Sequence, residues 1–404
     1  MKVLLLAPGS RGDVAPAAGL AASFMGDGHE VVVVANREYE ALVDHAGCGF
    51  VAIDATIDPS GDELGSGSGV KAYMAALRQY MEAAASAALT AVTDVDVVLA
   101  NTISPYGHDI AEALRVPSAE VLLQPSFPSR AYPPMIASAY DLGPANRLAG
   151  RVAQRVSTPY DPACARVRSE MGLPPESRRD AQKRRRREGM PVHHGISAAV
   201  LPRPAEWPAE LTQDGFRWPP SEPAWTPAPE LGQFLADGSA PVVFSLGSMP
   251  GGERVAEAVT ESLRITGFRA FVQGPDLTGT PSLLPDGQAI HVGDVPHEWL
   301  LPRASSVVHH AGAGVASSAL RAGTPSVSLP LHTDQPFWAR RLHQLSAGTR
   351  PAPMKKVTAG QLAALLTEAA TSQGLKHGAQ ALQAAVTKED STLALRRWLD
   401  CLSL

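Results

Sequence analysis

The sequence has little cysteine and no long apolar run near its start. Its three cysteines, Cys48, Cys164 and Cys401, lie far apart and show none of the paired spacings of a disulfide framework or a zinc site. This pattern fits a reducing compartment, and we expect a cytoplasmic protein. The first residues, MKVLLLAPG, hold an apolar run of five residues before Pro8, too short for a signal-peptide core or a membrane span. We expect this run to form a strand.

The sequence also lacks an excess of positive charge. With 35 basic and 40 acidic residues the net charge is -5, which argues against nucleic acid as a partner. The composition, with 45% hydrophobic and 19% charged residues, is that of a soluble globular protein. A chain of 404 residues is too long for one ordinary core, so we expect two or three domains.

Short apolar runs alternate with amphipathic or alanine-rich stretches through most of the chain. Such alternation indicates parallel strands that are covered by helices on both faces of a sheet. In the first half, the predicted strands are VLLLA (3–7), VVVVA (31–35), FVAID (50–54), DVVLA (96–100), EVLLQ (120–124) and ISAAVL (196–201). In the second half they are VVFSLG (242–247), FRAFVQG (268–274), AIHVGDV (289–295), SVVHH (306–310) and SVSLP (326–330).

Between the two halves the pattern stops. The stretch 201–230 is rich in proline and tryptophan and has no period, which is typical of an interdomain linker. We therefore predict two doubly wound α/β units in series, residues 1–217 and residues 231–387, with the linker proper at 218–230. The last segment, 388–404, has the pattern of one more helix.

In doubly wound sheets ligands bind beyond the carboxyl ends of the strands, so the turns at those ends are the first candidates for a site. The turn APGSRGDVAP follows the first predicted strand. Gly9 and Gly12 permit a tight turn, Pro16 is expected to start the helix, and Asp13 is left near the helix start. From the local pattern alone Asp13 is a helix cap or a general base, and one residue can be both.

The turn HHAGAGV, residues 309–315, follows another predicted strand. It resembles a dinucleotide fingerprint, but Ser317 stands at the third glycine position and the usual acidic residue is missing, which argues against a dehydrogenase. A more general device remains, because backbone N–H groups at a helix start attract phosphate. His310 beside them is either a structural histidine or a hydrogen-bond donor to a phosphoryl oxygen.

Motifs along nearly the whole chain carry a resemblance to a known family. They are GSRGDVAP (9–16), FSLGSM (244–249), GDVPHEWLLPRASSVVHHAGAG (293–314) and LRAGTPSVSLPLHTDQPFWARR (320–341), together with LLQPSFPSRAYPP (122–134), RVRSEMGLPP (166–175) and AVLPRPAEWP (199–208). In this order they resemble GT-B fold glycosyltransferases of family 1, and most of all the bacterial sterol-glucosyltransferase-like and antibiotic glycosyltransferase branch. The resemblance implies two Rossmann-like domains that face each other across a cleft.

The resemblance also implies roles for single residues. The C-terminal domain is expected to bind a UDP- or dTDP-sugar, and the N-terminal domain an acceptor, with Asp13 as general base. The final helix, 388–404, is expected to pack back on the N-terminal domain. The residues implied for the donor are Ser10, Arg11, Gly247, Ser248, Val295, His310, Gly312, Ala313, Gly314, Val315, Asp334 and Gln335, and those for the acceptor are Tyr106, Gln124 and Phe127.

The implied activity is an inverting transfer of a sugar to a hydroxyl of a hydrophobic small molecule, such as a natural product, a polyketide or a sterol-like lipid. A helix N-terminus stabilises the departing diphosphate and a base activates the hydroxyl on the opposite face of the sugar. Neither needs a cofactor or a metal ion, so we expect none. Oligomeric state stays open.

Several positions depart from the family pattern. Val315 and Ala316 stand where many relatives carry hydroxyl residues, Ser318 where several carry a carboxylate that binds the ribose, and Asp294 where several carry a tryptophan that stacks on the base. The choice between UDP and dTDP is therefore not readable. Two alternatives stay open, a non-catalytic partner protein of the same fold and a sugar-nucleotide 2-epimerase. An epimerase needs no acceptor, so the acceptor-like segment 124–134 argues against it.

Two further patterns have an ordinary explanation beside a functional one. Asp94-Val95-Asp96 matches the D-x-D motif of metal-dependent glycosyltransferases of another fold, but it stands at the start of a strand, the wrong end for a site. In the stretch 178–187, seven of ten residues are cationic. We interpret it as a solvated loop or flexible insert, with an anionic acceptor or an anionic membrane surface as the alternatives.

Overall fold

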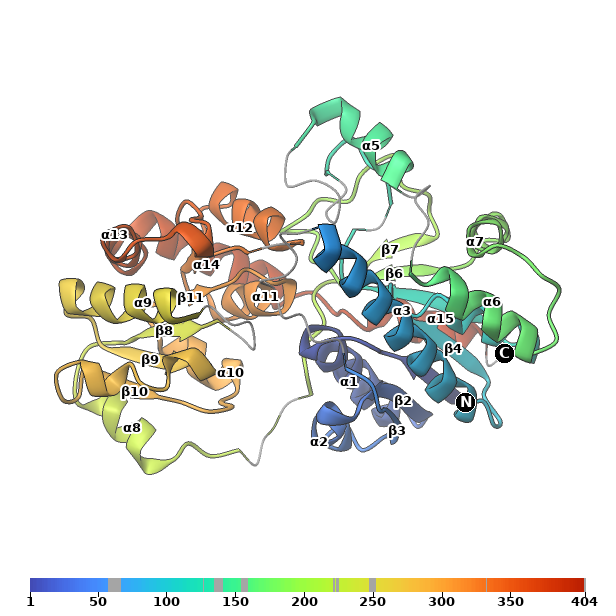
Figure 1. Ribbon diagram of the computed structural model, residues 1–404, viewed down its shortest axis with the longest axis horizontal. Helices are drawn as coiled ribbons and strands as arrows, with labels where there is room; N and C mark the ends of the chain where they lie inside the picture. Colours follow the sequence, from blue (N-terminus) through green and yellow to red (C-terminus); the bar gives the residue numbers. More distant parts are fainter. Residues whose placement is uncertain are drawn as a thin grey trace.

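The computed structural model describes residues 1–56, 67–125, 127–133, 141–153, 159–220, 222, 225–246, 252–331 and 333–402. Within these ranges the chain forms two α/β units, each built on a parallel sheet (Figure 1). This confirms the predicted fold class. No helix of the described ranges combines the length and the apolar character that crossing a membrane requires.

The N-terminal unit contains a seven-stranded sheet in the order β3-β2-β1-β4-β5-β6-β7. Its strands are β1 (Lys2–Leu6), β2 (Glu30–Asn36), β3 (Gly49–Ile53), β4 (Val97–Ala100), β5 (Ser118–Leu122), β6 (Val192–His194) and β7 (Leu211–Gln213). Its helices are α1 (Arg11–Gly26), α2 (Glu40–Asp44), α3 (Gly67–Thr90), α4 (Gly107–Leu114), α5 (Asn146–Ala153), α6 (Asp161–Glu170) and α7 (Arg178–Arg187). The strand order reverses between β1 and β4, which opens a crevice at their carboxyl ends.

The C-terminal unit contains a five-stranded sheet in the order β10-β9-β8-β11-β12. Its strands are β8 (Val242–Ser245), β9 (Ala270–Gln273), β10 (Ala289–His291), β11 (Ser306–His309) and β12 (Ser326–Ser328). The helices of this half of the chain are α8 (Pro229–Ala236), α9 (Gly252–Thr266), α10 (His297–Leu300), α11 (Ala313–Ala322), α12 (Gln335–Gln344), α13 (Ala359–Thr371), α14 (Gln373–Val386) and α15 (Leu393–Leu402). Here the order reverses between β8 and β11, so the second crevice lies where the 309–315 turn begins.

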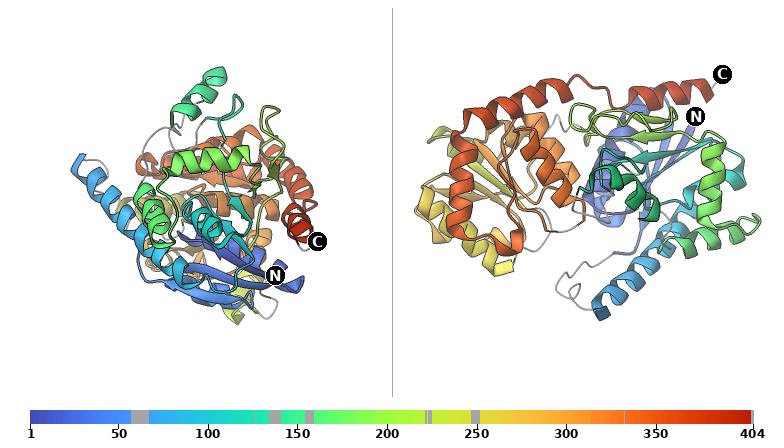
Figure 2. Two further views of the ribbon diagram at one scale, coloured as in Figure 1. Left: turned by 90° about the vertical axis from the view of Figure 1, so that its right-hand side faces the viewer. Right: turned by 90° about the horizontal axis from the view of Figure 1, so that it is seen from above.

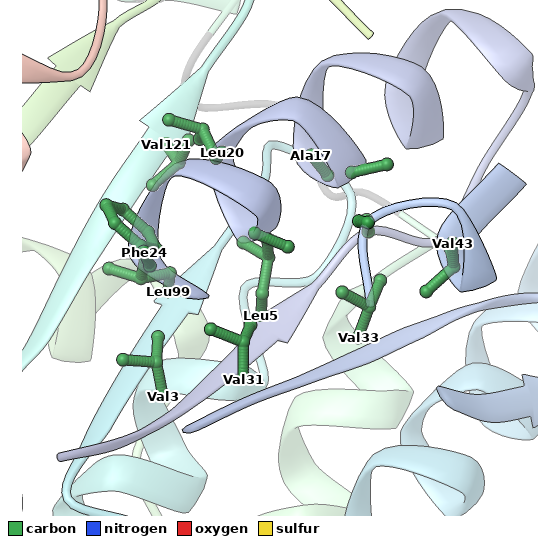
Figure 3. Packing of buried hydrophobic residues seen from close by; sticks show 14 of the residues in the cluster. Val3, Leu5, Ala17, Leu20, Phe24, Val31, Val33, Val43, Leu99 and Val121 are labelled. Carbon is green, nitrogen blue, oxygen red and sulfur yellow. The ribbon is translucent and has the colours of Figure 1, made fainter. Parts of the chain in front are cut away.

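The continuous apolar runs of the strands are explained by burial on both faces of the sheet. Side chains alternate along a strand, so Val3 and Leu5 of β1 face α1 and pack with Leu20 and Phe24 (Figure 3). Leu4 and Leu6 point to the other face and pack against residues of α3 and α4. Helices therefore cover both faces of the sheet. Because α1 follows β1 directly, the start of α1 lies at the edge of the first crevice.

The last helix returns to the first unit. The chain crosses from the C-terminal unit to the N-terminal unit, and both ends of the chain lie on the N-terminal unit (Figure 2). Leu395 and Leu399 of α15 are fully buried in the core that β1 and α1 form. Arg396 of α15 also forms an ion pair with Asp27 at 2.5 Å.

One predicted strand is wrong. The run ISAAVL, residues 196–201, forms turns, and the strand next to it is the shorter β6. The apolar side chains of Ile196, Val200 and Leu201 are instead buried between the two units, where they pack with a group that includes Phe337 and Trp338 of α12. Burial at an interface and burial in a sheet leave the same apolar run in the sequence.

The strand β6 itself contains two buried histidines. His193 Nδ1 lies 3.2 Å from Asp214 Oδ2, and His194 Nδ1 lies 3.1 Å from the carbonyl of Thr212. These contacts satisfy polar groups that would otherwise be costly to bury. Polar residues with such partners give no apolar signal, so this strand was not predicted.

The proline- and tryptophan-rich stretch is more ordered than its composition indicates. It contains β7, which pairs with β6 and completes the N-terminal sheet. Trp207 stacks on His194 with ring centres 4.9 Å apart, and Trp225 lies 5.2 Å from Trp299 of the C-terminal unit. The tryptophans of this stretch therefore pack on both units.

The arginine-rich stretch is not a loop. Residues 178–187 form helix α7, which begins after Ser177, whose side chain accepts a hydrogen bond from the Asp180 backbone. Arg185 is buried and forms ion pairs with Asp109 at 2.5 Å and Glu112 at 2.7 Å. The interpretation as a solvated loop is therefore wrong, because carboxylates of neighbouring helices bind part of its positive charge.

Candidate functional site

A cleft of about 2400 Å³ lies between the two units and is lined by the segments that follow the strands of both sheets. Sites for one small ligand usually occupy roughly 300 to 1,000 Å³. The cleft is therefore large enough for two ligands side by side. Most of the predicted site residues line it.

Asp13 lies in the first turn of α1 on the N-terminal wall of this cleft. Its Oδ2 accepts hydrogen bonds from the backbone N–H of Ser10 at 2.9 Å and from the Ser10 hydroxyl at 3.0 Å. The residue therefore caps the helix. Helix α1 also begins at Arg11, so the expectation that Pro16 starts it is wrong.

The pKa of Asp13 is shifted to the range that a base near neutral pH requires. Burial of the carboxyl group raises its pKa to about 6, the two bonds from Ser10 lower it, and the charge of Asp334 raises it further. The side chain still lines the cleft. A carboxylate of this kind is ionised at pH 7 and binds a proton more readily than an exposed one.

The turn behind Asp13 holds this carboxylate in place. Gly9 has φ of 126°, and a Cβ there would lie 2.4 Å from Asp13 Oδ2. The Gly9 N–H donates to the Tyr80 hydroxyl at 2.7 Å, and this hydroxyl donates to Asn36 Oδ1 at 2.5 Å. Glycine is therefore required at position 9, and α3 and β2 support the turn from behind.

On the opposite wall, the β11–α11 turn presents the start of a helix to the cleft. Gly312 is the N-cap of α11, and a Cβ at Gly312 would lie 2.6 Å from His310 Nε2, so the imidazole packs across the helix start. Ala311 has φ of 62°, and its N–H donates to His309 Nδ1 at 3.0 Å. The first N–H groups of α11 have no partner within the helix and are available to an anion.

The hydroxyl groups of α11 do not supplement these N–H groups. Ser317 Oγ and Ser318 Oγ donate to the carbonyl of Gly314 at 2.8 and 2.9 Å. Val315, in the first turn, lines the cleft without a polar group. The polar groups that this turn offers to an anion are therefore the backbone N–H groups and the imidazole of His310.

Two contacts join the walls of the cleft directly. Arg11 Nη1 lies 3.2 Å from Asp294 Oδ2, and Gln124 Nε2 donates to Asp334 Oδ2 at 2.8 Å. Asp334 also accepts from Trp338 Nε1 at 3.1 Å, which fixes its carboxylate at the start of α12. Asp13 and Asp334 are close enough to raise the pKa of Asp13.

The structure brings most of the sequence-predicted site residues together. The next residue of α12, Gln335, is buried, and its Oε1 accepts from the Leu331 N–H at 2.8 Å. Gly247 and Ser248 lie outside the described residues. The predicted residues that line the cleft are Ser10, Arg11, Asp13, Gln124, Phe127, Val295, His310, Gly312, Ala313, Gly314, Val315, Asp334 and Gln335.

The prediction for Tyr106 is wrong. Its side chain is fully buried in the core between the sheet, α3 and α6. It is the N-cap residue of α4, and its ring packs into this core instead of lining the cleft. Burial raises the pKa of its hydroxyl well above the ordinary value.

Three polar residues of the C-terminal wall were missed. Ser245 Oγ donates to Gln273 Oε1 at 3.0 Å and lies 3.3 Å from His297 Nε2. Burial lowers the pKa of His297 to about 4, so its ring is neutral at pH 7. Ser245 and Gln273 end the neighbouring strands β8 and β9, so a search for polar residues at every strand end would have found them.

The D-x-D pattern lies away from the cleft. Asp96 stands at the amino end of β4, where its Oδ2 accepts from the backbone N–H of Lys2 at 2.7 Å. It therefore helps to align β1 with β4. Among the residues that the structure describes, no group of three or more histidine, cysteine, aspartate or glutamate side chains is placed to hold a metal ion.

Two family models match the chain in the two units. Residues 3–133 match the glycosyltransferase family 28 N-terminal domain, and residues 275–392 match the C-terminal domain of the erythromycin biosynthesis protein CIII-like family. The chain is 31% identical over 409 residues to O-mycaminosyltylonolide 6-deoxyallosyltransferase of Streptomyces fradiae, covering 96% of this chain and 94% of that protein. It is 26% identical to a sterol 3-beta-glucosyltransferase of Neosartorya fischeri over 96% of this chain but only 29% of that longer protein.

Solved glycosyltransferase structures share the fold over the whole chain. The glycosyltransferase of kitacinnamycin superimposes with a TM-score of 0.74 at 18% identity, covering 99% of this chain and 98% of that one. The calicheamicin glycosyltransferase CalG4 gives a TM-score of 0.70 at 17% identity over 99% and 98% of the two chains. VinC, solved in complex with dTDP, gives 0.67 at 17% identity over 100% of both.

Proposed function

Because this chain belongs to the GT-B glycosyltransferases of the antibiotic and sterol type, we propose that it moves a sugar from a UDP- or dTDP-sugar to a hydroxyl of a hydrophobic small molecule, with inversion and without a metal ion. The observation that carries the proposal is the pairing of Asp13 on one wall with the start of α11 on the other wall of the same cleft. Each provides one half of a glycosyl transfer.

Asp13 would act on the acceptor. The acceptor hydroxyl gives its proton to the Asp13 carboxylate while its oxygen forms a bond to C1 of the sugar. The bond from C1 to the diphosphate breaks on the opposite side, and the electron pair leaves with the diphosphate. Attack and departure on opposite faces invert the anomeric centre, so an α-linked donor gives a β-linked product.

The start of α11 would hold the diphosphate. Its free N–H groups and its dipole contribute about 0.3 to 2 kcal/mol to a bound anion, and the contribution grows as negative charge develops on the leaving group. His310, which packs across Gly312, is placed to donate a further hydrogen bond. Because Ser317 and Ser318 bond to the helix backbone, we assign no phosphate contact to them.

Asp334 and Gln335 would hold the sugar between these two groups. Trp338 and Gln124 orient the Asp334 carboxylate from two sides. Asp334 also comes close enough to Asp13 to affect its pKa, which is the relation expected when one residue binds the sugar and the other the attacking hydroxyl. VinC and the spinosyn rhamnosyltransferase have been solved with thymidine diphosphate, so dTDP-sugars are the first donors to test.

The experiment is a donor panel followed by an acceptor panel. We expect dTDP or UDP to raise the melting temperature, and the matching nucleotide sugar to glycosylate an aromatic or polyketide alcohol, detected by product mass. NMR of the product should show the β-anomer, and EDTA should leave the rate unchanged. Binding without turnover on any acceptor would favour the non-catalytic alternative, and conversion of the donor alone to its C2 epimer would favour the epimerase.

A further inference from the structure

The cations of α7 divide into two groups by their partners. Arg178 pairs with Asp161 at 2.6 Å, Arg184 with Glu112 at 2.7 Å and with Glu176 at 2.9 Å, and Arg185 with Asp109. These arginines bind α7 to α4 and α6. Their number is explained by the acidic surface beneath the helix, and they need no ligand.

Arg186 does not follow this pattern. Its side chain lines the cleft, and its guanidinium carbon lies 4.1 Å above the centre of the Phe127 ring. Its Nε is buried and has no hydrogen-bond partner among the described residues. This donor is closed off from the cleft, so a ligand there meets the Nη edge of the guanidinium, which forms no ion pair with the described residues and requires polar partners from water or a ligand.

The acidic side chain whose charge acts on Arg186 does not supply that partner. Glu120 also lines the cleft, but it accepts a hydrogen bond from Gln182 at 3.2 Å and forms no ion pair with Arg186. Its charge favours the charged form of Arg186, but burial outweighs it and lowers the pKa of Arg186 below its ordinary value. Arg186 remains charged at neutral pH, because an arginine pKa lies far above 7.

The position of Arg186 restricts what the missing partner is. Phe127, on which it stacks, Glu120, whose charge acts on it, and Gln182, one turn earlier in α7, all belong to the N-terminal unit and line the cleft. This is the wall that carries Asp13, so the partner belongs to the molecule that the proposed function places there, the acceptor. A flat guanidinium stacked on an aromatic ring presents its edge, which matches a carboxylate bound through two oxygens.

We propose that the acceptor of this enzyme carries a carboxylate in addition to the hydroxyl that receives the sugar, and that Arg186, supported by Phe127, binds it. The inference rests on the proposed function for the identity of the ligand as acceptor. It narrows the acceptor from hydrophobic molecules in general to hydrophobic hydroxy acids. The remainder of α7 has no part in it.

The test compares 6-hydroxy-2-naphthoic acid with its methyl ester, which differ in the charge of the carboxyl group and in one methyl group. Dissociation constants are measured by calorimetry at pH 7.5, in the presence of saturating dTDP or UDP, for the wild type and for Arg186→Gln, Arg186→Lys and Arg187→Gln. Arg187 is exposed on the same helix and outside the cleft, so its substitution is the matched control for charge. Circular dichroism checks that every variant is folded.

We expect the wild type and Arg187→Gln to bind the acid at least about tenfold more tightly than the ester, as a charge-assisted contact implies. Arg186→Gln should abolish the preference, and Arg186→Lys should retain part of it. Equal binding of acid and ester by the wild type, no binding of either, or a preference that survives in Arg186→Gln would overturn the proposal. If a variant does not fold, the affinities of the wild type for the acid and for the ester still test the proposal.

Turnover of both probes with the donor, followed by product mass, separates this inference from the proposed function. A preference for the acid that depends on Arg186, without product from either probe, supports the carboxylate site, and the catalytic role is then decided separately by the acceptor panel. Glycosylation of the ester as efficient as that of the acid supports the transferase and removes the carboxylate site.

Discussion

A single side chain, Asp13, has two tasks that are usually considered alternatives. Its Oδ2 accepts both Ser10 donors and thereby begins α1, while the same carboxyl group lines the cleft. In the proposed mechanism the two tasks support each other, because the cap bonds fix the orientation of the carboxylate that we propose as the base. They also moderate its pKa, which burial alone would raise further.

Substitution of Asp13 by asparagine separates the two tasks. The amide oxygen still accepts the Ser10 N–H, so the fold should persist, but no base remains and kcat should fall about 100- to 10,000-fold. Because the pKa of Asp13 is raised from 3.8 to about 6, its ionisation destabilises the fold as the pH rises through 6. Asp13→Asn should therefore melt at the same temperature as the wild type or a higher one at pH 8. Full activity of the variant would remove Asp13 as the base.

The pKa of Asp13 also predicts a pH profile. Only the ionised carboxylate accepts a proton, so kcat/KM should rise with pH through about 6 and level off above 7. The measurement is the initial rate at low acceptor concentration, using an acceptor whose own ionisation lies outside this range. A profile that is flat between pH 5 and pH 8 would show that another group controls the reaction.

The sequence predicted the site residues whose position depends on a local turn. It did not predict those whose side-chain direction depends on how neighbouring helices pack. Asp13 and the 309–315 turn follow directly from a strand and a glycine, so their position at the cleft was predictable. Tyr106 also follows a strand, but whether its ring points to the cleft or the core depends on how α4 packs under α3. His297 needed the positions of neighbouring elements. The charge of the stretch 178–187 was noted, with an anionic acceptor as one alternative, but only the packing of α7 shows that Arg186 stacks on Phe127 in the cleft.

At the scale of elements, the position of the His310 imidazole across the start of α11 depends on the small size of Gly312. A Cβ at Gly312 would come within 2.6 Å of His310 Nε2, although the backbone at Gly312, with φ of -62°, suits any residue. Gly312→Ala should therefore displace the imidazole without straining the chain.

We expect Gly312→Ala to weaken the binding of dTDP or UDP by about tenfold, roughly the loss of one hydrogen bond to a charged group. Calorimetric titration with the nucleotide measures it. Gly360→Ala, in the first turn of α13 with open space around it, is the control and should bind as the wild type does. Unchanged binding by Gly312→Ala would show that His310 does not contribute to the phosphate site.

The structure of helix α7 predicts that substitutions of two of its arginines, Arg185 and Arg187, affect stability differently. Arg185 is buried against Asp109 and Glu112, and Arg185→Met removes one of the arginines that these carboxylates share. Arg168 still pairs with Asp109 and Arg184 with Glu112, so the loss should be that of a charged hydrogen bond, and the free energy of unfolding should fall by about 1.5 to 3 kcal/mol. Arg187 is exposed, and Arg187→Met should change the free energy of unfolding by less than about 0.5 kcal/mol. Urea titrations of both variants test this. Equal stabilities would mean that the buried ion pairs are not formed in solution.

The alternation of strands and helices was predictable because burial on both faces makes the strands apolar along their whole length. The exceptions have opposite causes. Residues 196–201 are apolar because they lie between the two units, and β6 is polar because His193 and His194 find partners at Asp214 and Thr212. A local window contains neither the second unit nor these partners.

At the scale of the whole molecule, the two units are connected by several kinds of contact besides the apolar group in which residues 196–201 pack against α12. The tryptophan-rich stretch packs on both, the contacts Arg11–Asp294 and Gln124–Asp334 cross the cleft, and α15 carries the end of the chain from one unit to the other. The cross-cleft contacts involve residues that we assign to ligand binding, so they are expected to exchange partners when a donor enters. The connection through α15 is apolar and buried, and it is expected to persist.

Helix α15 should therefore stabilise the N-terminal unit, although most of the chain separates this helix from β1 and α1. Leu399 is 0% exposed within the core of the N-terminal unit, whereas Leu402, one turn later, is 37% exposed. Truncation of a fully buried leucine to alanine costs about 2 to 5 kcal/mol, because the transfer term and a cavity term add. Leu402→Ala should cost much less.

The measurement is urea unfolding followed by the fluorescence of the tryptophans, among which Trp398 packs against this core. Leu399→Ala should shift the transition of the N-terminal unit to lower urea and leave the nucleotide-binding affinity of the C-terminal unit unchanged below that transition. Leu402→Ala should unfold as the wild type does. If both variants unfolded alike, α15 would be an appendage, and the two units would be held together by the cleft contacts, the tryptophan-rich stretch and the apolar group of residues 196–201 and α12.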